Sequence, residues 1–324
     1  MRAVVVRRHG GPEVLESEDR PEPEPGPGEL AVDVAAAGVN FIDVYHRIGL
    51  YPTTPPFVPG VEGAGRVAAV GEGVLGIEVG DRVAWAMTAG GSYAPRALVP
   101  AARAVPVPSE LPDEVAAGAL LQGMTAHYLT HSTYPVRAGD TVLVHAAAGG
   151  TGALITQFVR RLGGHVIGTV STEEKERLAR ESGADEVIRY DREDVAPAVR
   201  RLTNGVGVAA VYDGVGAATI DGSLASLSPR GLLAVFGASS GPVPPFDLQR
   251  LNSGGSLFVT RPSLAHYVAT REDLLERADA VFTGLITGDL RMRVGGRYPL
   301  AQASQAHEDL QSRHSTGKLL LLTR

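Results

Sequence analysis

The stretch HAAAGGTGAL, residues 145–154, lies between an apolar run at 141–146 and a helix-like run at 153–163. Ala146, Gly149 and Gly152 have the spacing A-x-x-G-x-x-G, a variant of the dinucleotide-binding fingerprint in which alanine replaces the first glycine. Glycine suits this turn because a side chain would keep backbone amides from a pyrophosphate and the helix from the strand. The stretch predicts a strand, a phosphate-binding turn and a helix.

The surrounding sequence favours a dinucleotide site over an ordinary tight turn of an α/β domain. Apolar runs of five or six residues alternate with helical segments from about residue 140 onward, which is typical of a parallel sheet built from strand-helix-strand units. Thr172 is expected to cap one helix and Gly183 to end it. The expected strands are 141–146, 165–170, 186–190, 208–213, 232–237 and 256–260.

The first 120 residues have a different texture. Short β-like runs at 3–6, 30–39 and 65–71 are interrupted by segments rich in proline and glycine at 21–29 and 51–60. This pattern predicts an irregular, turn-rich β domain. After residue 262 the sequence predicts a longer helix over 271–286 and a final helix-strand pair that ends at 318–323.

Composition excludes several classes of function. The 324 residues are 44% apolar, enough for two domains, and the net charge of −6 with scattered basic residues argues against nucleic acid or an anionic membrane as partner. The chain has no cysteine, so it has no disulfides, thiolate nucleophiles or cysteine-ligated zinc. The N-terminus shows neither a signal peptide nor a membrane span, so we expect a cytoplasmic enzyme.

The residues after the second predicted strand indicate which dinucleotide is bound. An NAD site usually has Asp or Glu there, whereas this chain has Ser171 followed by Lys175. A carboxylate would repel a 2′-phosphate, while a hydroxyl and an ammonium would bind it, so the sequence predicts NADPH. Tyr190 is expected to join this pocket. Alternatively, Lys175 is a solvated helix residue paired with Glu174 or Glu176.

Motifs along nearly the whole chain resemble one family. They are similar to the quinone oxidoreductases related to zeta-crystallin, a zinc-free branch of the medium-chain dehydrogenase/reductase superfamily. The resemblance covers both halves of the chain and is far more specific than the glycine turn. It is carried by AAGVNFIDVYHRIGLYP (36–52), GVEGAGRVAAVGEGV (60–74), GDRVAWA (80–86), LLQGMTAHYL (120–129), HAAAGGTG (145–152), FGASSG (236–241) and FVTRPSL (258–264).

The resemblance implies an α/β architecture with two domains. A GroES-like irregular β domain would span 1–121 and be completed by 262–324, and a Rossmann domain with a doubly wound parallel sheet would span 122–261. The active site would lie in the cleft between them. Family members commonly pair an edge strand across a two-fold axis, so we expect a homodimer through 256–260, where pairing satisfies open backbone groups.

The chain departs from the zinc alcohol dehydrogenases of the same superfamily. Where those enzymes carry a zinc-binding Cys and His, this chain has AGVNFID and PGVEG, with Gly38, Val39 and Val61 near those positions. We therefore expect no metal and no Lewis acid. The prediction is NADPH-dependent reduction of quinones by direct transfer from the nicotinamide, without metal or flavin, and one-electron transfer remains an alternative to hydride transfer.

The resemblance also assigns cofactor contacts to individual residues. The segment around Arg313, SRHSTGKLL, differs somewhat from the family pattern. The nicotinamide half would lie beside Asn40, Phe41, Ile42, Asp43 and Tyr45, and its amide would be reached by Thr260, Arg261 and Pro262. The diphosphate and ribose would lie beside Tyr128, Gly149 and Gly150, and the 2′-phosphate beside Ser171, Lys175, Tyr190 and Arg313. Gly214 with Phe236, Gly237, Ala238 and Ser239 would cover the cofactor.

Tyr51 introduces a rival substrate class. The spacing of Asn40, Asp43, Gly49 and Tyr51 is similar to a motif of enoyl thioester reductases, in which the tyrosine is implicated in protonating the substrate carbon. A phenol beside a developing enolate can donate a proton or a hydrogen bond. We therefore predict Asn40, Tyr45 and Tyr51 as catalytic residues and keep an enone or enoyl substrate as the alternative. Tyr51 could also simply pack in the proline-rich loop.

Other polar groups carry weaker predictions. His127 and His131 are four apart on a predicted helix, but a useful metal site needs a third ligand. His145 is expected to be a strand-end residue, and residues 307–309 the exposed side of the last helix. A non-enzymatic NADPH-binding structural or RNA-binding protein is the alternative from another class, although the acidic balance argues against RNA.

Overall fold

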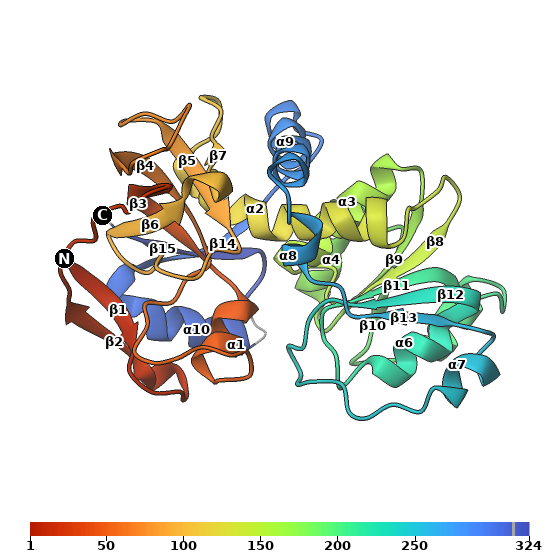
Figure 1. The fold of residues 1–324 in the computed structure, drawn as a ribbon. Coiled ribbons are helices and arrows are strands. Elements are labelled where there is room, and N and C mark those ends of the chain that lie inside the picture. Colours follow the sequence, from red (N-terminus) through yellow and green to blue (C-terminus); the bar gives the residue numbers. More distant parts are fainter. Residues whose placement is uncertain (313–314, 324) are drawn as a thin grey trace. The chain divides into compact units, whose positions relative to one another are not determined.

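The computed structural model describes residues 1–312 and 315–323, which form two compact units. The first unit consists of Met1–Met124, Val268–Gly288 and Met292–Arg324. The second unit consists of Thr125–Tyr267 and Asp289–Arg291. Figure 1 shows segments from both ends of the chain in the first unit and the middle of the chain in the second.

The strands of the first unit pair mostly in antiparallel fashion, except that β14 and β15 are parallel. A seven-stranded sheet has the order β14-β15-β3-β4-β5-β7, with β6 also paired to β3, and β1 and β2 form a separate two-stranded sheet. Because β15 pairs with β3, the end of the chain completes a sheet begun near its start. The strands are β1(Arg2–Val6), β2(Leu15–Asp19), β3(Glu29–Val39), β4(Glu62–Val70), β5(Arg82–Ala86), β6(Arg96–Pro100), β7(Val105–Pro106), β14(Val294–Pro299) and β15(Lys318–Leu322).

Strand β3 shows how the sequence builds two cores in this unit. Its first half places Leu30, Val32 and Val34 in one apolar cluster around Trp85, whereas its second half contributes Ala37, Val39 and their neighbours to another. The residues that enter an apolar cluster therefore change from even to odd numbers along the strand. The register shift between Val34 and Ala36 supplies the physical reason, because a bulge reverses which face each later side chain takes.

The helices of the first unit begin and end at recognisable signals. In α1 the Oδ2 of Asp43 accepts the backbone N–H of Asn40 at 2.9 Å, which caps the first turn. Thr270 caps α9, and Gly288 ends it with φ of 79°. No helix within the described residues is long and apolar enough to cross a membrane. The helical segments are η1(Pro12–Val14), α1(Phe41–Arg47), η2(Ala101–Arg103), α2(Asp113–Tyr128), α9(Arg271–Thr287), η4(Leu300–Gln302) and α10(Ala303–Gln311).

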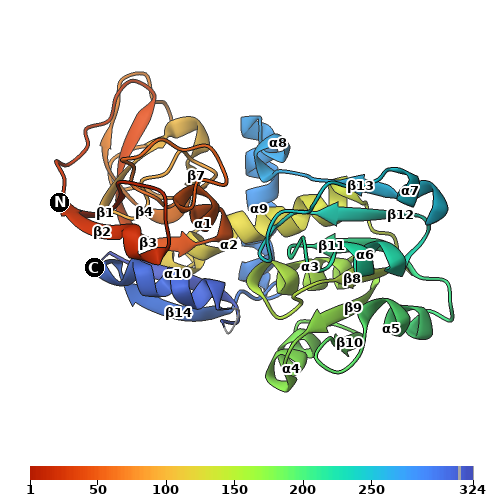
Figure 2. The ribbon, with the colours of Figure 1, turned by 90° about the horizontal axis from the view of Figure 1, so that it is seen from below.

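The second unit contains a six-stranded parallel sheet with the order β10-β9-β8-β11-β12-β13, and Figure 2 shows the strands side by side in this order. Numbered within the sheet this is 3-2-1-4-5-6, the doubly wound order of dinucleotide-binding domains. The predicted α/β class with a GroES-like domain and a Rossmann sheet is therefore confirmed. The strands are β8(Thr141–Val144), β9(His165–Val170), β10(Glu186–Arg189), β11(Val208–Asp213), β12(Leu227–Val235) and β13(Phe258–Thr260).

Helices cover both faces of this sheet, with α3 and α6 on opposite sides in Figure 1. The predicted cap of α4 is confirmed, because the Thr172 side chain accepts the N–H of Lys175. Gly183 follows this helix with φ of 101°, the conformation that glycine adopts without strain. The helical segments are η3(Leu129–Thr133), α3(Gly150–Arg161), α4(Glu173–Glu181), α5(Val195–Leu202), α6(Ile220–Ser226), α7(Gln249–Ser253) and α8(Leu264–Tyr267).

Three local predictions differ from the structure. Strand β12 begins at Leu227, five residues before the expected start, because its pairing with β11 continues across a register shift. Strand β14 was not expected, since the glycines of Val294–Pro299 hide its alternating pattern. Residues 307–309 are not simply the exposed side of the last helix: His307 is fully buried and hydrogen-bonded to two side chains from distant segments.

Candidate active site

The glycine turn lies between β8 and α3 in the second unit. Ala146, at the position of the first fingerprint glycine, has φ of 51°, a left-handed conformation that usually favours glycine. A Cβ on Gly152 would lie 2.4 Å from the carbonyl oxygen of Ala146, so only glycine fits there. The predicted close approach of helix and strand at Gly152 is thus present in the structure.

The N-terminus of α3 has the features of a phosphate cradle. Gly149 is its N-cap and forms no side-chain cap, so the amides of the first turn keep their donors for another acceptor. Gly149 and Gly150 are partly exposed, and the helix dipole favours an anion at this end. These groups fit the pyrophosphate of a dinucleotide, because glycine leaves the backbone donors accessible.

A buried polar network lies beneath the turn. His145 Nδ1 lies 3.0 Å from Thr169 Oγ1, and its Nε2 lies 3.0 Å from Ser223 Oγ. Ser223 donates to Asp213, which also accepts the backbone N–H groups of residues 215 and 216. Burial lowers the pKa of His145, so the ring stays neutral. The network joins the turns after β8 and β11, and it confirms His145 as a strand-end residue.

The loops after β11 and β12 pack closely together. Ser239 donates its backbone N–H to the carbonyl of Gly214 at 3.3 Å. A Cβ on Gly237 would lie 2.3 Å from that same carbonyl, and one on Gly214 would meet the Phe236 ring at 3.0 Å. The structure therefore brings together the expected covering segments at residues 214 and 236–239, and glycine makes this approach sterically feasible.

The segment after β13 lies next to these loops. Thr260 is paired in register with Ala234 of β12. The Arg261 Nη1 donates to the carbonyl of Val235 at 3.0 Å, and Pro262 is buried. These residues therefore stand at the carboxyl ends of the last two strands, the edge at which ligands bind in open α/β sheets.

The proposed 2′-phosphate pocket is also assembled from neighbouring strand ends. Ser171 directly follows β9, Lys175 lies in the first turn of α4, and the backbone N–H of Tyr190 donates to Val170. Tyr190 is 52% exposed, so its ring is available to a ligand. The remaining expected residue, Arg313, lies outside the described residues. The geometry thus places three of the four residues together.

Tyr128 and the two helix histidines occupy packed positions. Tyr128 is only 1% exposed, and its ring stacks on Tyr267 at 4.2 Å between centroids. The rings of His127 and His131 stack at 4.1 Å, and His131 Nδ1 lies 3.0 Å from the carbonyl of His127. Among residues 1–312 and 315–323, no group of three metal-ligating side chains is present. These rings are therefore packed against neighbours, and the expected cofactor contact of Tyr128 stays a prediction.

In the first unit, Asn40 has its amide fixed by three partners. Its Oδ1 accepts from the Lys318 ammonium at 2.7 Å, and its Nδ2 donates to Glu62 Oε2 at 3.0 Å and to the carbonyl of Gly38 at 3.2 Å. Asn40 is 5% exposed. Its side chain is therefore held inside the unit, at the start of the helix that carries Tyr45.

The ion pair beside Asn40 was not identified from the sequence. Lys318 and Glu62 lie 2.6 Å apart and are both fully buried. The Glu62 Oε1 also accepts the backbone N–H of Leu121 from α2 at 2.7 Å. Two signals could have revealed the pair: a glutamate in the short apolar stretch PGVEG, and a lysine that begins the apolar strand KLLLL in a chain with only two lysines.

Asp43 connects this site to a second buried chain of polar groups. It accepts from the backbone N–H groups of Asn40 and Val61 and from the Tyr93 hydroxyl at 3.2 Å. Burial raises the pKa of Asp43 to about 7, against the opposing effect of these backbone donors. A carboxyl group with this pKa changes its protonation near neutral pH.

Tyr93 continues this chain to the last helix. Its hydroxyl lies 3.0 Å from His307 Nε2, and His307 Nδ1 lies 3.1 Å from Arg47 Nη1. Because Arg47 can only donate, Nδ1 is the acceptor and the proton of the ring is on Nε2. Burial, with the nearby Arg47 charge, lowers the pKa of His307 to about 3, so this imidazole is neutral.

Aromatic side chains gather on α1 and the loop after it. The ring centroids of Tyr45 and Tyr51 lie 5.2 Å apart in an edge-on arrangement, and those of Phe41 and Tyr45 lie 6.2 Å apart. The backbone N–H of Tyr51 donates to the carbonyl of Tyr45 at 3.2 Å. Tyr51 therefore packs against the helix and is partly exposed, a position compatible with both packing and proton donation.

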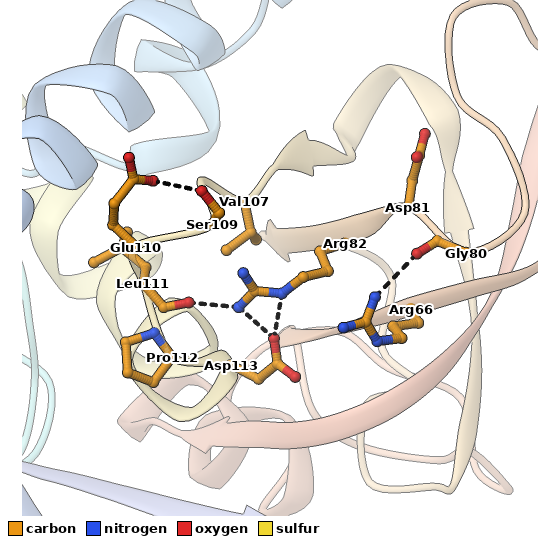
Figure 3. Close-up of a pocket in the computed structure, with 10 residues that line it drawn as sticks. All are labelled: Arg66, Gly80, Asp81, Arg82, Val107, Ser109, Glu110, Leu111, Pro112 and Asp113. Carbon is orange, nitrogen blue, oxygen red and sulfur yellow. Dashed lines mark hydrogen bonds and ion pairs between the residues drawn. The ribbon is translucent and has the colours of Figure 1, made fainter.

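A hollow of about 710 Å³ in the first unit, shown in Figure 3, contains none of the expected site residues. Its central Arg82 binds Asp113 through Nε and Nη2 at 2.8 and 2.6 Å and donates to the carbonyl of Pro108. Glu110 and Asp81 add negative charge to its lining. Because the arginine is already paired, the hollow fits a structural link between β5 and α2.

Comparison with known protein families gives the class of the protein. Residues 26–109 match the model described as alcohol dehydrogenase GroES-like domain, and residues 150–278 match the model described as zinc-binding dehydrogenase. Together with the Rossmann strand order, these matches define a member of the medium-chain dehydrogenase/reductase superfamily. The expected lack of zinc stays a prediction.

More similar relatives define the family within this class. A quinone oxidoreductase of Pseudomonas aeruginosa is 46% identical over 317 residues, which are 97% of each chain. A mycobacterial protein solved in complex with NADPH is 52% identical, with a TM-score of 0.96 over 99% of this chain and 100% of the other. A 2-haloacrylate reductase of a Burkholderia species is 42% identical over 99% of this chain and 98% of its own length. The chain belongs to the quinone oxidoreductase family.

Proposed function

We propose that the protein is an NADPH-dependent quinone oxidoreductase. The observation that carries this proposal is full-length similarity to quinone oxidoreductases combined with a glycine cradle that fits a dinucleotide. NADPH supplies a hydride from its nicotinamide when it is bound, and a quinone is a suitable acceptor because it becomes aromatic on reduction. The protein's own task is to bind and orient the reactants and to exclude water.

The second unit supplies the cofactor site in this proposal. The amides at the start of α3 hold the diphosphate, since they are donors at the positive end of a helix. Ser171, Lys175 and Tyr190 hold the 2′-phosphate, because their strand ends are adjacent and a hydroxyl and an ammonium complement a dianion. Gly214 and residues 236–239 cover the bound dinucleotide. We also propose that Arg313 joins the phosphate pocket.

The first unit supplies the acceptor site. Phe41 and Tyr51 are partly exposed and offer aromatic rings against which a planar quinone can stack, while the buried Tyr45 packs against both of them. Asn40 fixes the start of the helix that carries two of these rings, and Asp43 caps it. We propose that Tyr45 and Tyr51 contact the acceptor, and that Tyr128, whose ring stacks on Tyr267, contacts the diphosphate and ribose of the cofactor.

The first experiment is to measure initial rates of NADPH oxidation with 1,4-benzoquinone, an ortho-quinone and a medium-chain enone, with NADH in parallel. Turnover of the quinones with preference for NADPH is the expected result. Equal rates with NADH would contradict the phosphate pocket. Cofactor binding without turnover of any acceptor would favour the non-enzymatic alternative.

Reduction of an activated alkene is the second candidate. The observation in its favour is the similarity to a 2-haloacrylate reductase, together with a tyrosine beside the aromatic cluster. In this reaction the Tyr51 hydroxyl would donate a proton to the substrate carbon. A rate with the enone that falls in Tyr51→Phe, while the quinone rate is unchanged, would support this function; equal rates in both proteins would exclude proton donation by Tyr51.

The proposed assembly is a cytoplasmic homodimer formed through β13. This strand is at the edge of the parallel sheet, and its Phe258 and Val259 are 58% and 39% exposed. An edge strand with exposed apolar side chains can pair with a second copy of itself, which satisfies its open backbone groups.

A further inference from the structure

We propose that Lys318 is a positioning residue of the active site. Its buried ammonium, together with Glu62, holds the amide of Asn40 in one orientation and so fixes the start of α1. The inference rests on the proposed function, in which the aromatic side chains of α1 contact the acceptor. It assigns a role in the reaction to an ion pair that does not touch the substrate.

The hydrogen bonds allow only one orientation of the Asn40 amide. Both amide hydrogens are donated, one to Glu62 and one to Gly38, and the Oδ1 accepts from Lys318. Rotating the amide by half a turn would place its NH₂ group against the ammonium and its oxygen against the carboxylate. Because all these groups are buried, no water can replace the lost partners without a cost.

Gly38 and Gly118 leave space for the side chain of Lys318. A Cβ on Gly38 would lie 2.8 Å from Lys318 Nζ and 2.3 Å from Glu62 Oε2. A Cβ on Gly118 would lie 2.8 Å from the Cγ of Lys318. The backbone of β3 and α2 therefore approaches the lysine along its whole length. This fit restricts where the ammonium can lie, as a positioning role requires.

Asn40 transmits this constraint to the aromatic side chains. It is the N-cap of α1, and its backbone N–H donates to Asp43 in the first turn. Tyr45 follows on the same short helix, and its carbonyl accepts the backbone N–H of Tyr51. A shift of Asn40 therefore moves both tyrosines together. Displacement of about 1 Å at a reaction site can lower a rate by about a hundredfold.

The absence of cysteine from the chain permits a chemical rescue experiment. Lys318→Cys introduces one thiol, which can be aminoethylated in denaturant to restore a side chain of lysine length and charge before refolding. We expect Lys318→Cys to lower kcat by about tenfold or more, to leave the KM for NADPH unchanged, and to increase amide hydrogen exchange at residues 40–47 in the cofactor-free protein. Aminoethylation should reverse both effects.

Two controls separate positioning from general stability. Wild-type protein taken through the same alkylation and refolding has no thiol and should keep its rate. The double variant Arg82→Met/Asp113→Asn removes another ion pair of the same unit, outside the site, and should lower the melting temperature without lowering kcat. A purely structural role of Lys318 would give the same behaviour as this control.

A second variant decides the result if Lys318→Cys does not refold. Glu62→Gln/Lys318→Met removes both charges, so no unpaired ion stays buried. A lower kcat with faster exchange at 40–47 is again expected, whereas unchanged kcat and unchanged exchange would overturn the proposal. If wild-type protein reduces no acceptor, the proposed function fails, and the exchange rates of the cofactor-free variants still decide whether the ion pair positions α1.

Discussion

At the scale of single residues, the glycine turn shows two different steric requirements. Ala146 adopts a positive φ although it has a side chain, whereas Gly152 has no room for a Cβ. The first position is strained but allowed, because the left-handed region costs an alanine only about 1–2 kcal/mol. At Gly152 a side chain is excluded, since a Cβ would collide with the backbone carbonyl of Ala146, which cannot rotate away. Substitution at the two positions should therefore have very different effects.

We predict that Gly152→Ala lowers the free energy of unfolding by about 1–3 kcal/mol and weakens NADPH binding, because the helix must move from the strand. Gly222→Ala is the matched control, since a Cβ there meets nothing within 4 Å in α6. That change should stabilise by up to about 1 kcal/mol. Urea denaturation and cofactor titration measure both effects, and unchanged values for Gly152→Ala would contradict the steric argument.

Lys175 gives a prediction about cofactor choice. Lys175→Ala should weaken NADPH binding by about tenfold or more and leave NADH binding nearly unchanged, because only NADPH carries the 2′-phosphate. Arg177→Ala, which removes a positive charge of the same helix that is paired with Glu181, is the control and should affect neither cofactor. Fluorescence titration of both dinucleotides is the measurement. Equal losses would show that Lys175 does not bind the phosphate.

At the scale of elements, buried polar chains connect segments that are distant in sequence. Arg47 of α1, Tyr93 and His307 of α10 form one such chain, which ends at Asp43. The prediction that residues 307–309 face solvent was wrong for His307, because helical position alone does not reveal that Tyr93 and Arg47 meet the helix there. The same chain combines two groups whose pKa values shift in opposite directions.

The opposite pKa shifts of Asp43 and His307 predict how the free energy of unfolding depends on pH. The folded pKa of Asp43 is raised from 3.8 to about 7. Its contribution to the free energy of unfolding is therefore stabilising at low pH and is lost as the pH rises from 3.8 to about 7. The folded pKa of His307 is lowered from 6.5 to about 3, so its contribution is lost as the pH falls below 6.5. Between about pH 4 and 6.5 the two effects cancel in the wild-type protein.

Asp43→Asn should remove this balance. With only the His307 effect left, the free energy of unfolding of the variant relative to wild type should fall by about 1.4 kcal/mol per pH unit as the pH decreases from 6.5 to 4. Urea denaturation at several pH values measures the difference. Parallel curves for the two proteins would show that the two pKa shifts do not oppose each other in this way.

At the scale of the whole molecule, the chain builds two large sheets of different kinds besides the two-stranded sheet of β1 and β2. The mixed sheet of the first unit includes β15 from the end of the chain, paired with β3, while the parallel sheet is formed by the middle of the chain. Because β15 and β4 both pair with β3, Lys318 meets Glu62 across 256 residues. The parallel sheet leaves β13 at its edge.

The exposed edge predicts the assembly. Wild-type protein should behave as a dimer of the 33.8 kDa chain, and Phe258→Lys should dissociate it, because the substitution replaces an exposed apolar side chain of the pairing strand with a charge. Leu248→Lys, which changes an exposed apolar residue outside β13, is the control and should remain dimeric. Light scattering after gel filtration measures the mass. A monomeric wild-type protein would contradict the interface.

The sequence by itself determined the features that depend on local order. These features are the alternation of strand and helix, the spacing of Ala146, Gly149 and Gly152, and the cap at Thr172. Each depends on residues within one or two turns of each other, so each can be recognised in the sequence. The cofactor class followed in the same way from Ser171, directly after β9, and Lys175, in the first turn of the next helix. The family resemblance then supplied the expected contacts at residues 40–51.

Only the tertiary structure decided which polar groups are buried together. Three buried polar groupings each join elements that are far apart in the sequence: the Lys318–Glu62 pair, the network around His145, and the chain from Asp43 to His307. The largest separation is 264 residues, in the hydrogen bond from Arg47 to Gln311. A buried polar group is stable only with a partner. The partner's identity depends on sheet topology and register, which local patterns do not specify.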